Sequence, residues 1–187
     1  MGGTYLWWIG EGPTDEQMMQ EMRAHVEHVF GPPVKIWRGV ERPADTFDPA
    51  RRQHSSSQIL RWLLGTRPQD AEKILALTDA DLFIPVLTFV FGEAQLEGPT
   101  AVVSTARLAR NPDGRLADRR LLAARLAKEC VHELGHTFGL VHCSDRRCVM
   151  ARAAGLLDVD AKRGALCGDC RLRFQDVPQQ RGGQGHE

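Results

Sequence analysis

Three histidines and a glutamate in the last third of the chain have the spacing of a metal-dependent hydrolase. His132, Glu133, His136, Gly139 and His142 form H-E-x-x-H-x-x-G-x-x-H, and each fixed position has a mechanical reason. On a helix, four residues advance the chain by about 6 Å and about 400°, so His132 and His136 leave the same face and can bind one ion. Glu133 then projects beside the ion, where a general base for the attacking water belongs.

The remaining positions of the motif complete the predicted site. Gly139 permits a left-handed backbone at a helix end, which would turn the chain back. His142 could then be the third ligand and leave one position open, as a catalytic zinc requires. The alternative is three ordinary histidines on a helix, but the five positions would match by chance in a chain of this length on the order of once in 10⁵. We therefore predict a catalytic zinc site.

Four of the five cysteines indicate a second metal site. Cys143, Cys148, Cys167 and Cys170 lie as C-x4-C and C-x2-C, 18 residues apart, which is close to zinc-ribbon spacing. In an exported protein these cysteines could form disulfides instead. A filled four-thiolate site has no open position, so this zinc would be structural and would stabilise its segment by roughly 10–16 kcal/mol. We expect Cys130 to be an ordinary helix residue that faces away from the metal.

Composition excludes several classes of function. The chain has 187 residues, and Lys+Arg and Asp+Glu both number 24. The zero formal net charge argues against a nucleic-acid binder. The apolar run before Glu11 is too short for a signal peptide or a membrane span. We therefore expect a cytoplasmic protein with no nucleic-acid or membrane partner, and a monomer.

Five segments have strand-like patterns. They are Tyr5–Ile9, Lys35–Val40, Ile74–Thr78, Leu87–Gln95 and Thr100–Thr105. Helical patterns lie in the first two gaps between them, which predicts βαβ units with parallel strands. The short link around Glu97, Gly98 and Pro99 predicts a hairpin-like return instead. The expected fold is α/β (α+β), with a twisted mixed sheet of about five strands.

Helices must position the histidine motif and cover this sheet. The first predicted helix begins at a capping box of Thr14 and Gln17, and the second is Ser55–Leu64. A third helix of about twenty residues starts near Ala117 and carries the motif near its end. Its apolar residues recur at every fourth position: Leu122, Leu126, Cys130 and Leu134.

The chain after the motif is too poor in apolar periodicity to fold on hydrophobic burial alone. We expect residues 1–178 to form a single catalytic domain, with an N-terminal lobe at 1–142 and a zinc-stapled C-terminal lobe at 143–178. We predict that residues 179–187 form a flexible tail.

Three other stretches allow weaker predictions. Glu41–His54 is rich in proline and charge and reads as a loop. Asp79 and Asp81 are turn residues or, alternatively, calcium ligands. His25 and His28 lie three apart on a predicted helix, so they are surface residues or could share a metal.

The run from His132 to Cys170, H-E-x-x-H-x-x-G-x-x-H-C-x4-C-x-M-x16-C-x-x-C, resembles the archaemetzincins, a branch of the metzincin zinc peptidases. The resemblance implies that Met150 is the Met-turn residue beneath the three zinc histidines and that the cysteines bind a second zinc ion. It also implies a mixed sheet with helices above a cleft, and an edge strand at Leu87–Gln95 that pairs with an extended substrate. One spacing differs, because sixteen residues separate Met150 from Cys167 where the family pattern has seventeen.

The predicted function is a zinc-dependent peptidase that hydrolyses peptides or proteins, with Glu133 as the general base. The alternative is a non-catalytic zinc protein that binds peptides, and the intact Glu133 argues against it. Zinc-ribbon binding of nucleic acid has little support from the balanced charges. Tyr5, the only tyrosine, lies far from the motif in sequence, so the oxyanion would be stabilised by zinc or by a main-chain group.

Overall fold

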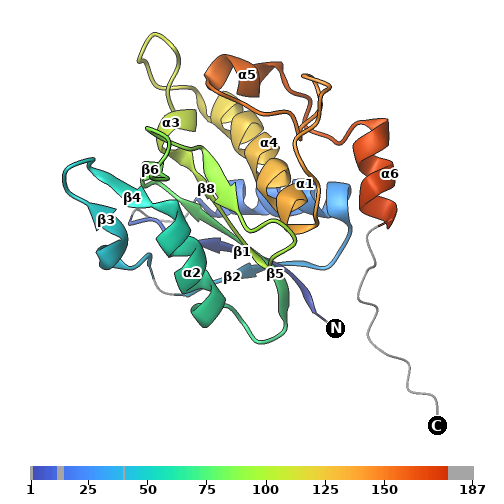
Figure 1. The fold of residues 1–187 in the computed structure, drawn as a ribbon, viewed down its shortest axis with the longest axis horizontal. Helices are drawn as coiled ribbons and strands as arrows, with labels where there is room; N and C mark the ends of the chain where they lie inside the picture. Colours follow the sequence, from blue (N-terminus) through green and yellow to red (C-terminus); the bar gives the residue numbers. More distant parts are fainter. Residues whose placement is uncertain (1, 12–14, 40, 177–187) are drawn as a thin grey trace.

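The computed structural model describes residues 2–11, 15–39 and 41–176, and it is built around a five-stranded sheet (Figure 1). In spatial order the strands are β2 (Val34–Trp37), β1 (Gly3–Trp8), β5 (Ala71–Thr78), β8 (Thr100–Ser104) and β7 (Gly92–Ala94). The first four strands are parallel, and β7 is antiparallel to β8. The predicted mixed sheet with a hairpin-like return is therefore confirmed.

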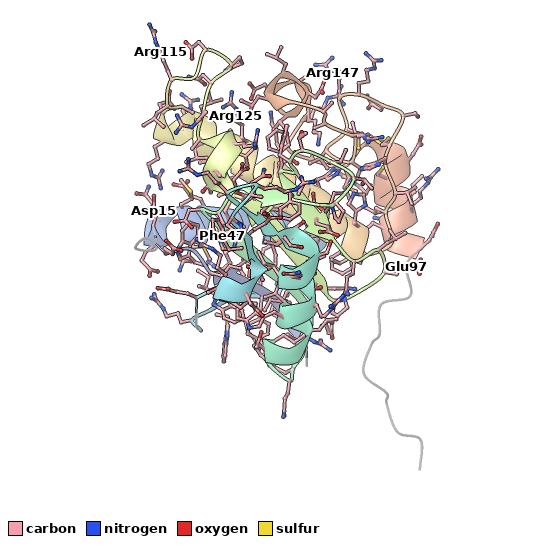
Figure 2. The ribbon with its side chains drawn as sticks, turned by 60° about the vertical axis from the view of Figure 1, so that its left-hand side comes forward. Asp15, Phe47, Glu97, Arg115, Arg125 and Arg147 are labelled. Atoms are coloured by element: carbon pink, nitrogen blue, oxygen red, sulfur yellow. The ribbon has the colours of Figure 1, made fainter. Side chains whose placement is uncertain are left out.

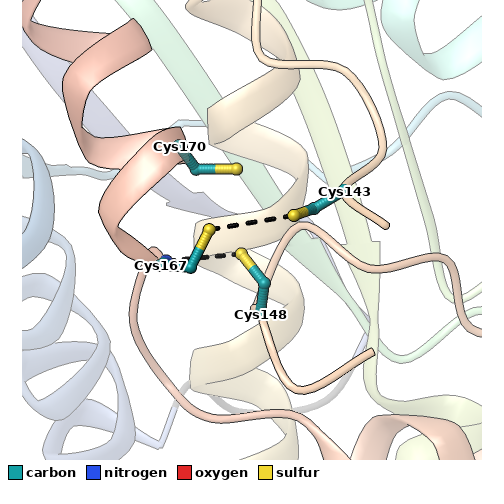
Figure 3. Close-up of side chains that lie close together, drawn as sticks. All are labelled: Cys143, Cys148, Cys167 and Cys170. Carbon is teal, nitrogen blue, oxygen red and sulfur yellow. Dashed lines mark hydrogen bonds between the residues drawn. The ribbon is translucent and has the colours of Figure 1, made fainter. Parts of the chain in front are cut away.

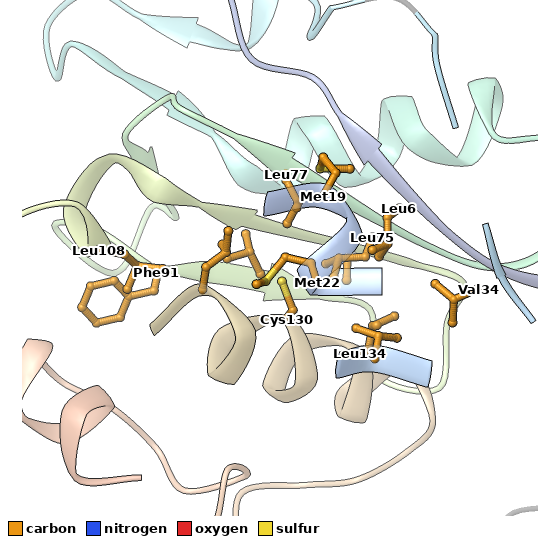
Figure 4. Close-up of a cluster of buried hydrophobic side chains, with 14 of the residues drawn as sticks. Leu6, Met19, Met22, Val34, Leu75, Leu77, Phe91, Leu108, Cys130 and Leu134 are labelled. Carbon is orange, nitrogen blue, oxygen red and sulfur yellow. The ribbon is translucent and has the colours of Figure 1, made fainter. Parts of the chain in front are cut away.

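Helices cover both faces of the sheet. The helices are α1 (Glu16–Phe30), α2 (Ser56–Thr66), α3 (Thr105–Leu108), α4 (Arg119–Thr137), α5 (Leu156–Ala161) and α6 (Gly168–Asp176). On one face α1 and α4 bury residues such as Met22 and Leu134 against Leu75 (Figure 4). On the other face Ile59 and Leu63 of α2 pack in a second apolar cluster. Each Å² of apolar surface that is buried contributes about 25 cal/mol to stability, so these two layers are the main stabilising contacts.

The start of α1 differs from the prediction. The N-cap is Asp15, whose Oδ1 accepts a hydrogen bond from the Met18 amide at 2.9 Å (Figure 2). Thr14, the predicted capping residue, lies outside the described residues. On the same helix the His25 imidazole donates from Nε2 to the Gly164 carbonyl at 2.8 Å, since a carbonyl oxygen can only accept. His25 therefore ties α1 to the C-terminal segment.

The predicted strand Leu87–Gln95 is too long. Only Gly92–Ala94 forms the strand β7, and Val90 makes a single bridge to Leu82. The carbonyls of Leu87 and Thr88 accept hydrogen bonds from the Arg51 and Gln53 side chains instead of from a neighbouring strand. The second strand is also shorter than predicted, because β2 ends at Trp37, while Val40 lies outside the described residues.

The predicted loop Glu41–His54 is not irregular throughout. It contains a 3₁₀ turn, η1 (Ala44–Thr46), and the strand β3 (Phe47–Asp48), and it enters β4 (Gln53–Ser55). With β6 (Leu82–Phe83), strands β3 and β4 form a three-stranded sheet that the sequence did not predict. These strands are two or three residues long, below the length at which alternation is visible in a sequence.

The carboxylates after β5 are paired with arginines. Asp79 accepts a hydrogen bond from Arg42 at 2.9 Å. Asp81 accepts one from Arg107 Nε at 2.7 Å and one from Arg107 Nη2 at 2.8 Å. A guanidinium beside each carboxylate repels a cation, which favours the turn interpretation over the calcium alternative.

The C-terminal segment packs on α4 rather than standing apart. Arg125, labelled in Figure 2, is almost fully buried. It holds both Asp160 oxygens at 2.7 Å and also donates to the carbonyls of Leu108 and Arg110. A third apolar cluster joins α4, α6 and the chain around Met150. The predicted tail at 179–187 lies outside the described residues. Among the described residues, every helix is too short or too polar to cross a lipid bilayer.

Candidate metal centres

Helix α4 carries three of the predicted site residues, and its ends are fixed. Asp118 caps the N-terminus by accepting from the Leu121 amide at 2.8 Å. At the C-terminus Gly139 has φ 86°, the left-handed region that glycine adopts most readily. The Gly139 amide donates to His136 O and the Leu140 amide to Gly135 O, both at 2.9 Å, which is a Schellman motif. The chain therefore reverses directly after His136.

Groups from the sheet side also hold the end of α4. The Lys73 ammonium, from β5, donates to the carbonyls of Thr137 at 2.6 Å and Gly98 at 3.0 Å. The Glu97 amide (Figure 2) donates to His136 O at 3.0 Å. Because the last carbonyls of a helix have no partner inside it, these donors satisfy them and fix the helix end relative to β5.

The three motif histidines converge. One ring nitrogen from each of His132, His136 and His142 lies within 4.8 Å of the others, and the Nε2 atoms of His132 and His136 are 3.2 Å apart. His132 Nδ1 lies 2.8 Å from Val149 O, and His136 Nδ1 lies 2.7 Å from Leu140 O. Since a carbonyl only accepts, both Nδ1 atoms carry the proton and both Nε2 atoms present a lone pair to the centre.

The surroundings of these imidazoles favour their neutral form. It lowers the pKa of His132 well below its usual value and also lowers the pKa of His136. The pKa of His142 is lowered by burial and then by the nearby Arg152 guanidinium. A neutral imidazole is the form that binds a metal.

Glu133 lies beside this cluster and is 6% exposed. Burial raises its pKa well above the usual value, the Glu129 carboxylate raises it further, and the Lys162 ammonium lowers it. Room for Glu133 depends on Gly92 in β7, because a Cβ there would lie 2.6 Å from Val102 O and 2.7 Å from Glu133 Cγ. Sequence reasoning missed Gly92, since nothing in the local pattern places β7 against α4.

A cavity of about 330 Å³ opens beside His132, Glu133 and His142. Its other walls are Leu87, Phe91, Gly92, Glu129, Arg152 and Ala153. Glu129 is buried and accepts from the Lys162 ammonium at 3.0 Å. Sequence reasoning placed three of these residues, Leu87, Phe91 and Gly92, in the predicted substrate-pairing strand Leu87–Gln95 and gave the other three no role. Helical spacing could have found Glu129, because it lies three residues before His132 and one turn before Glu133.

The four predicted cysteines also converge (Figure 3). Their sulfur atoms lie within 4.8 Å of one another, and Cys143 Sγ is 3.8 Å from Cys167 Sγ. A disulfide bond requires about 2.05 Å, and all five cysteines are free, so the disulfide alternative is wrong. The amides of Met150 and Cys167 both donate to Cys148 Sγ at 3.4 Å. Such donors favour a sulfur that carries negative charge. Cys130 is buried in the core between α4 and the sheet, away from both clusters (Figure 4).

Met150 lies between the two clusters. It is fully buried, and a Cβ on Gly135, in the middle of the histidine motif, would collide with its sulfur. The Cys143 amide donates to Met150 O at 3.0 Å, and the Ala151 amide donates to Cys148 O at 2.9 Å. The turn around Met150 therefore packs against α4 at Gly135 and also fixes the start of the cysteine segment.

The model of the family described as peptidase family M54 matches residues 2–176. The chain belongs to this family. An archaemetzincin from Methanocaldococcus jannaschii is 33% identical over 165 residues, which cover 88% of this chain and 89% of that protein. The crystal structure of the archaemetzincin from Methanopyrus kandleri superposes with a TM-score of 0.82 at 36% identity and covers 93% of each chain. A structure described as a zinc-dependent peptidase, from Methanocorpusculum labreanum, has a TM-score of 0.76 at 32% identity and covers 92% of this chain and 100% of that one.

Membership of the archaemetzincins settles the class of the protein. The predicted family and the predicted fold are both confirmed. The chain is a zinc metallopeptidase, and its substrates are peptides or proteins.

Proposed function

We propose that this archaemetzincin hydrolyses peptide bonds with His132, His136 and His142 as the ligands of a catalytic zinc and Glu133 as the general base. The separation of two ring nitrogens carries the proposal. Two nitrogen ligands of a tetrahedral zinc, each about 2.0–2.1 Å from it, lie roughly 3.3–3.4 Å apart, and the Nε2 atoms of His132 and His136 are 3.2 Å apart. Both atoms present lone pairs, which repel at this distance unless a cation lies between them. The donor set fits zinc.

The cysteine cluster fits a second, structural zinc by the same reasoning. Two thiolates at about 2.3 Å from a tetrahedral zinc lie roughly 3.8 Å apart, and the sulfurs of Cys143 and Cys167 are 3.8 Å apart. With Cys148 and Cys170 the four positions are filled, so this ion would hold structure and bind no substrate.

The roles of the chain's own groups follow from their surroundings. When bound, the catalytic zinc polarises the substrate carbonyl and lowers the pKa of the attacking water. A carboxylate of Glu133 takes the proton from that water and later passes it to the leaving amine. Burial raises the pKa of this carboxylate, which makes it a stronger base for the proton of the water. The Tyr5 hydroxyl is held by Asp70 at 2.8 Å and Lys35 at 3.0 Å, so tyrosine stabilises no oxyanion here.

The proposed path of the substrate runs along β7. This strand lies at the end of the main sheet and has β8 as its one neighbour there. Gly92 lies against Glu133, so a peptide that pairs with β7 passes the base. Glu93 is held by the hydroxyls of Ser56 and Ser57, which fixes the strand to the start of α2. Met150 fills the space under the motif and acts as the Met-turn residue.

The organisation of residues 1–178 as one catalytic domain is part of this proposal, and the third apolar cluster, which joins both predicted lobes, supports it. A monomer and a cytoplasmic location stay predictions from the sequence.

Glu133→Ala tests the mechanism. The purified protein and this variant are compared for bound zinc and for cleavage of a peptide library. We expect two zinc ions in both proteins, cleavage by the wild type, and a rate about 10²–10⁴-fold lower in the variant. His136→Ala is the matched control, since it should lose one zinc ion together with activity. Near-wild-type cleavage by Glu133→Ala would refute the general base. Two bound zinc ions with no peptide cleaved would favour a peptide-binding role.

A further inference from the structure

The cavity beside the histidine cluster contains a cation that the proposed chemistry does not use. Arg152 lines this cavity with Leu87 and His142, and it is exposed. We propose that Arg152 selects substrates with a carboxylate next to the scissile bond, so that this peptidase prefers acidic peptides. The proposal rests on the proposed function and names the substrate class of the same site.

The Arg152 guanidinium is available for a ligand. Within residues 2–11, 15–39 and 41–176 it has no hydrogen bond or ion pair. Arg107 and Arg125, in contrast, each hold an aspartate with two hydrogen bonds of 2.7–2.8 Å. A free guanidinium offers a planar pair of donors that matches a carboxylate.

Two carboxylates, those of Glu129 and Glu133, line the cavity, and in the part of the chain that the structure describes neither forms an ion pair with Arg152. Glu129 is paired with Lys162 at 3.0 Å, and both side chains are at most 3% exposed. A buried pair of this kind contributes no net charge to the cavity, whereas an unpaired Glu129 would attract Arg152 or a basic substrate. Lys162 thus neutralises Glu129, and Arg152 is the one arginine or lysine among the residues that line the cavity, whereas Glu133 lies against Gly92.

The shape of the cavity fits a peptide side chain. A volume of about 330 Å³ is at the lower end of the range for ligand sites, roughly 300–1,000 Å³, so it holds one or two residues. The apolar part of the cavity wall consists of Leu87, Phe91 and Ala153. The methylene groups of a substrate glutamate can pack against this part while the glutamate carboxylate reaches Arg152. The same carboxylate chemistry could come from the C-terminus of a short peptide, and the test separates the two sources.

The test uses one well-cleaved peptide in versions with Glu, Gln or Lys on each side of the scissile bond. Each version is made with a free and with an amidated C-terminus. We expect the wild type to prefer Glu over Gln by about three- to tenfold in kcat/KM at low salt, as for a partly exposed charge pair, and less at high salt. Arg152→Gln should remove the preference, and Arg152→Glu should shift it towards Lys. If amidation alone removes the preference, Arg152 binds the C-terminal carboxylate of the substrate rather than a side-chain carboxylate.

The control is Arg61→Gln, which removes the same charge from an exposed position on α2, on the other face of the sheet. It should leave the preference unchanged. The Kd values of the same peptides for the Glu133→Ala variant, with and without Arg152→Gln, give a readout without turnover. Equal kcat/KM and equal Kd for the Glu and Gln peptides would overturn the role of Arg152 while the peptidase proposal stands. Tighter binding of Glu peptides without cleavage of any peptide would support Arg152 and overturn the proposed mechanism.

Discussion

Replacing Gly92 by alanine would put a methyl group into the space that Glu133 occupies. The new Cβ would lie 2.6 Å from Val102 O, 2.7 Å from Glu133 Cγ and 2.9 Å from Glu133 Oε1, where ordinary contact starts at 3.4 Å. Val102 O belongs to β8, an internal strand held between β5 and β7, so it cannot withdraw. To reach ordinary contact, β7 must therefore move by about 0.8 Å away from Val102 O, and Glu133 Cγ must move by about 0.7 Å relative to the new methyl group.

Both adjustments have a measurable cost. Overpacking of a buried site costs about 1–3 kcal/mol, which lowers the Tm of a chain of this size by roughly 3–9 °C. A displacement of the base by about 1 Å costs about 10²-fold in rate. We therefore expect Gly92→Ala to keep its zinc and to lose between about tenfold and 10²-fold in kcat, with a lower Tm.

The measurements are kcat on the best library peptide, zinc content and thermal unfolding. Gly65→Ala is the matched control, because Gly65 lies in α2 with no atom near its added Cβ. It should keep kcat and gain up to about 1 kcal/mol in stability. Wild-type kcat and Tm in Gly92→Ala would refute the close packing of β7 against Glu133. Loss of zinc would show that the histidines had moved rather than the base.

Three further predictions concern the segment around the site. Lys162→Met should destabilise the fold by about 3–5 kcal/mol in urea unfolding, because Glu129 stays buried and unpaired, and adding Glu129→Gln should restore most of the loss. Cys167→Ser should lose one zinc and expose the chain after residue 142 to limited proteolysis; a variant as resistant as the parent would show that the cysteines do not hold this segment. Arg125 lowers the pKa of Asp160 below 3.8, so their pair should stabilise the protein above about pH 4 and lose this effect as the pH falls through the folded-state pKa. The stability difference between wild type and Asp160→Asn should therefore be present at pH 7 and shrink at pH 3, and a difference independent of pH would contradict the pair.

The features that the sequence predicted correctly are those with a short-range signal. Helix α4 has an apolar residue at every fourth position, and the histidine spacing matches one turn of the same helix, so both could be found without a fold. The parallel orientation of β1, β2 and β5 followed from the helices in the first two gaps between the predicted strands.

Features created by contacts between distant segments were missed or misplaced. The side chains of Arg51 and Gln53 take the backbone carbonyls that would extend β7, and they lie more than thirty residues away in the chain. Gly92 matters only because β7 is folded against α4. The pairing of Glu129 with Lys162 likewise needs the C-terminal segment to return to α4. A single sequence carries no signal for such pairs.

The hydrogen bond from the Cys143 amide to Met150 O has a consequence for the order in which the two proposed zinc sites fill. His142 is the motif histidine that does not come from α4, and its neighbour in the chain is a member of the cysteine cluster. Once the cysteines close around their ion, residue 142 is already near its bound position, so little chain entropy remains to be lost there. The thiolate site should therefore fill first and raise the affinity of the histidine site, and by thermodynamic reciprocity a filled histidine site should make the thiolate ion harder to remove. An oxidant that attacked the cysteines would then release the catalytic ion without touching a histidine.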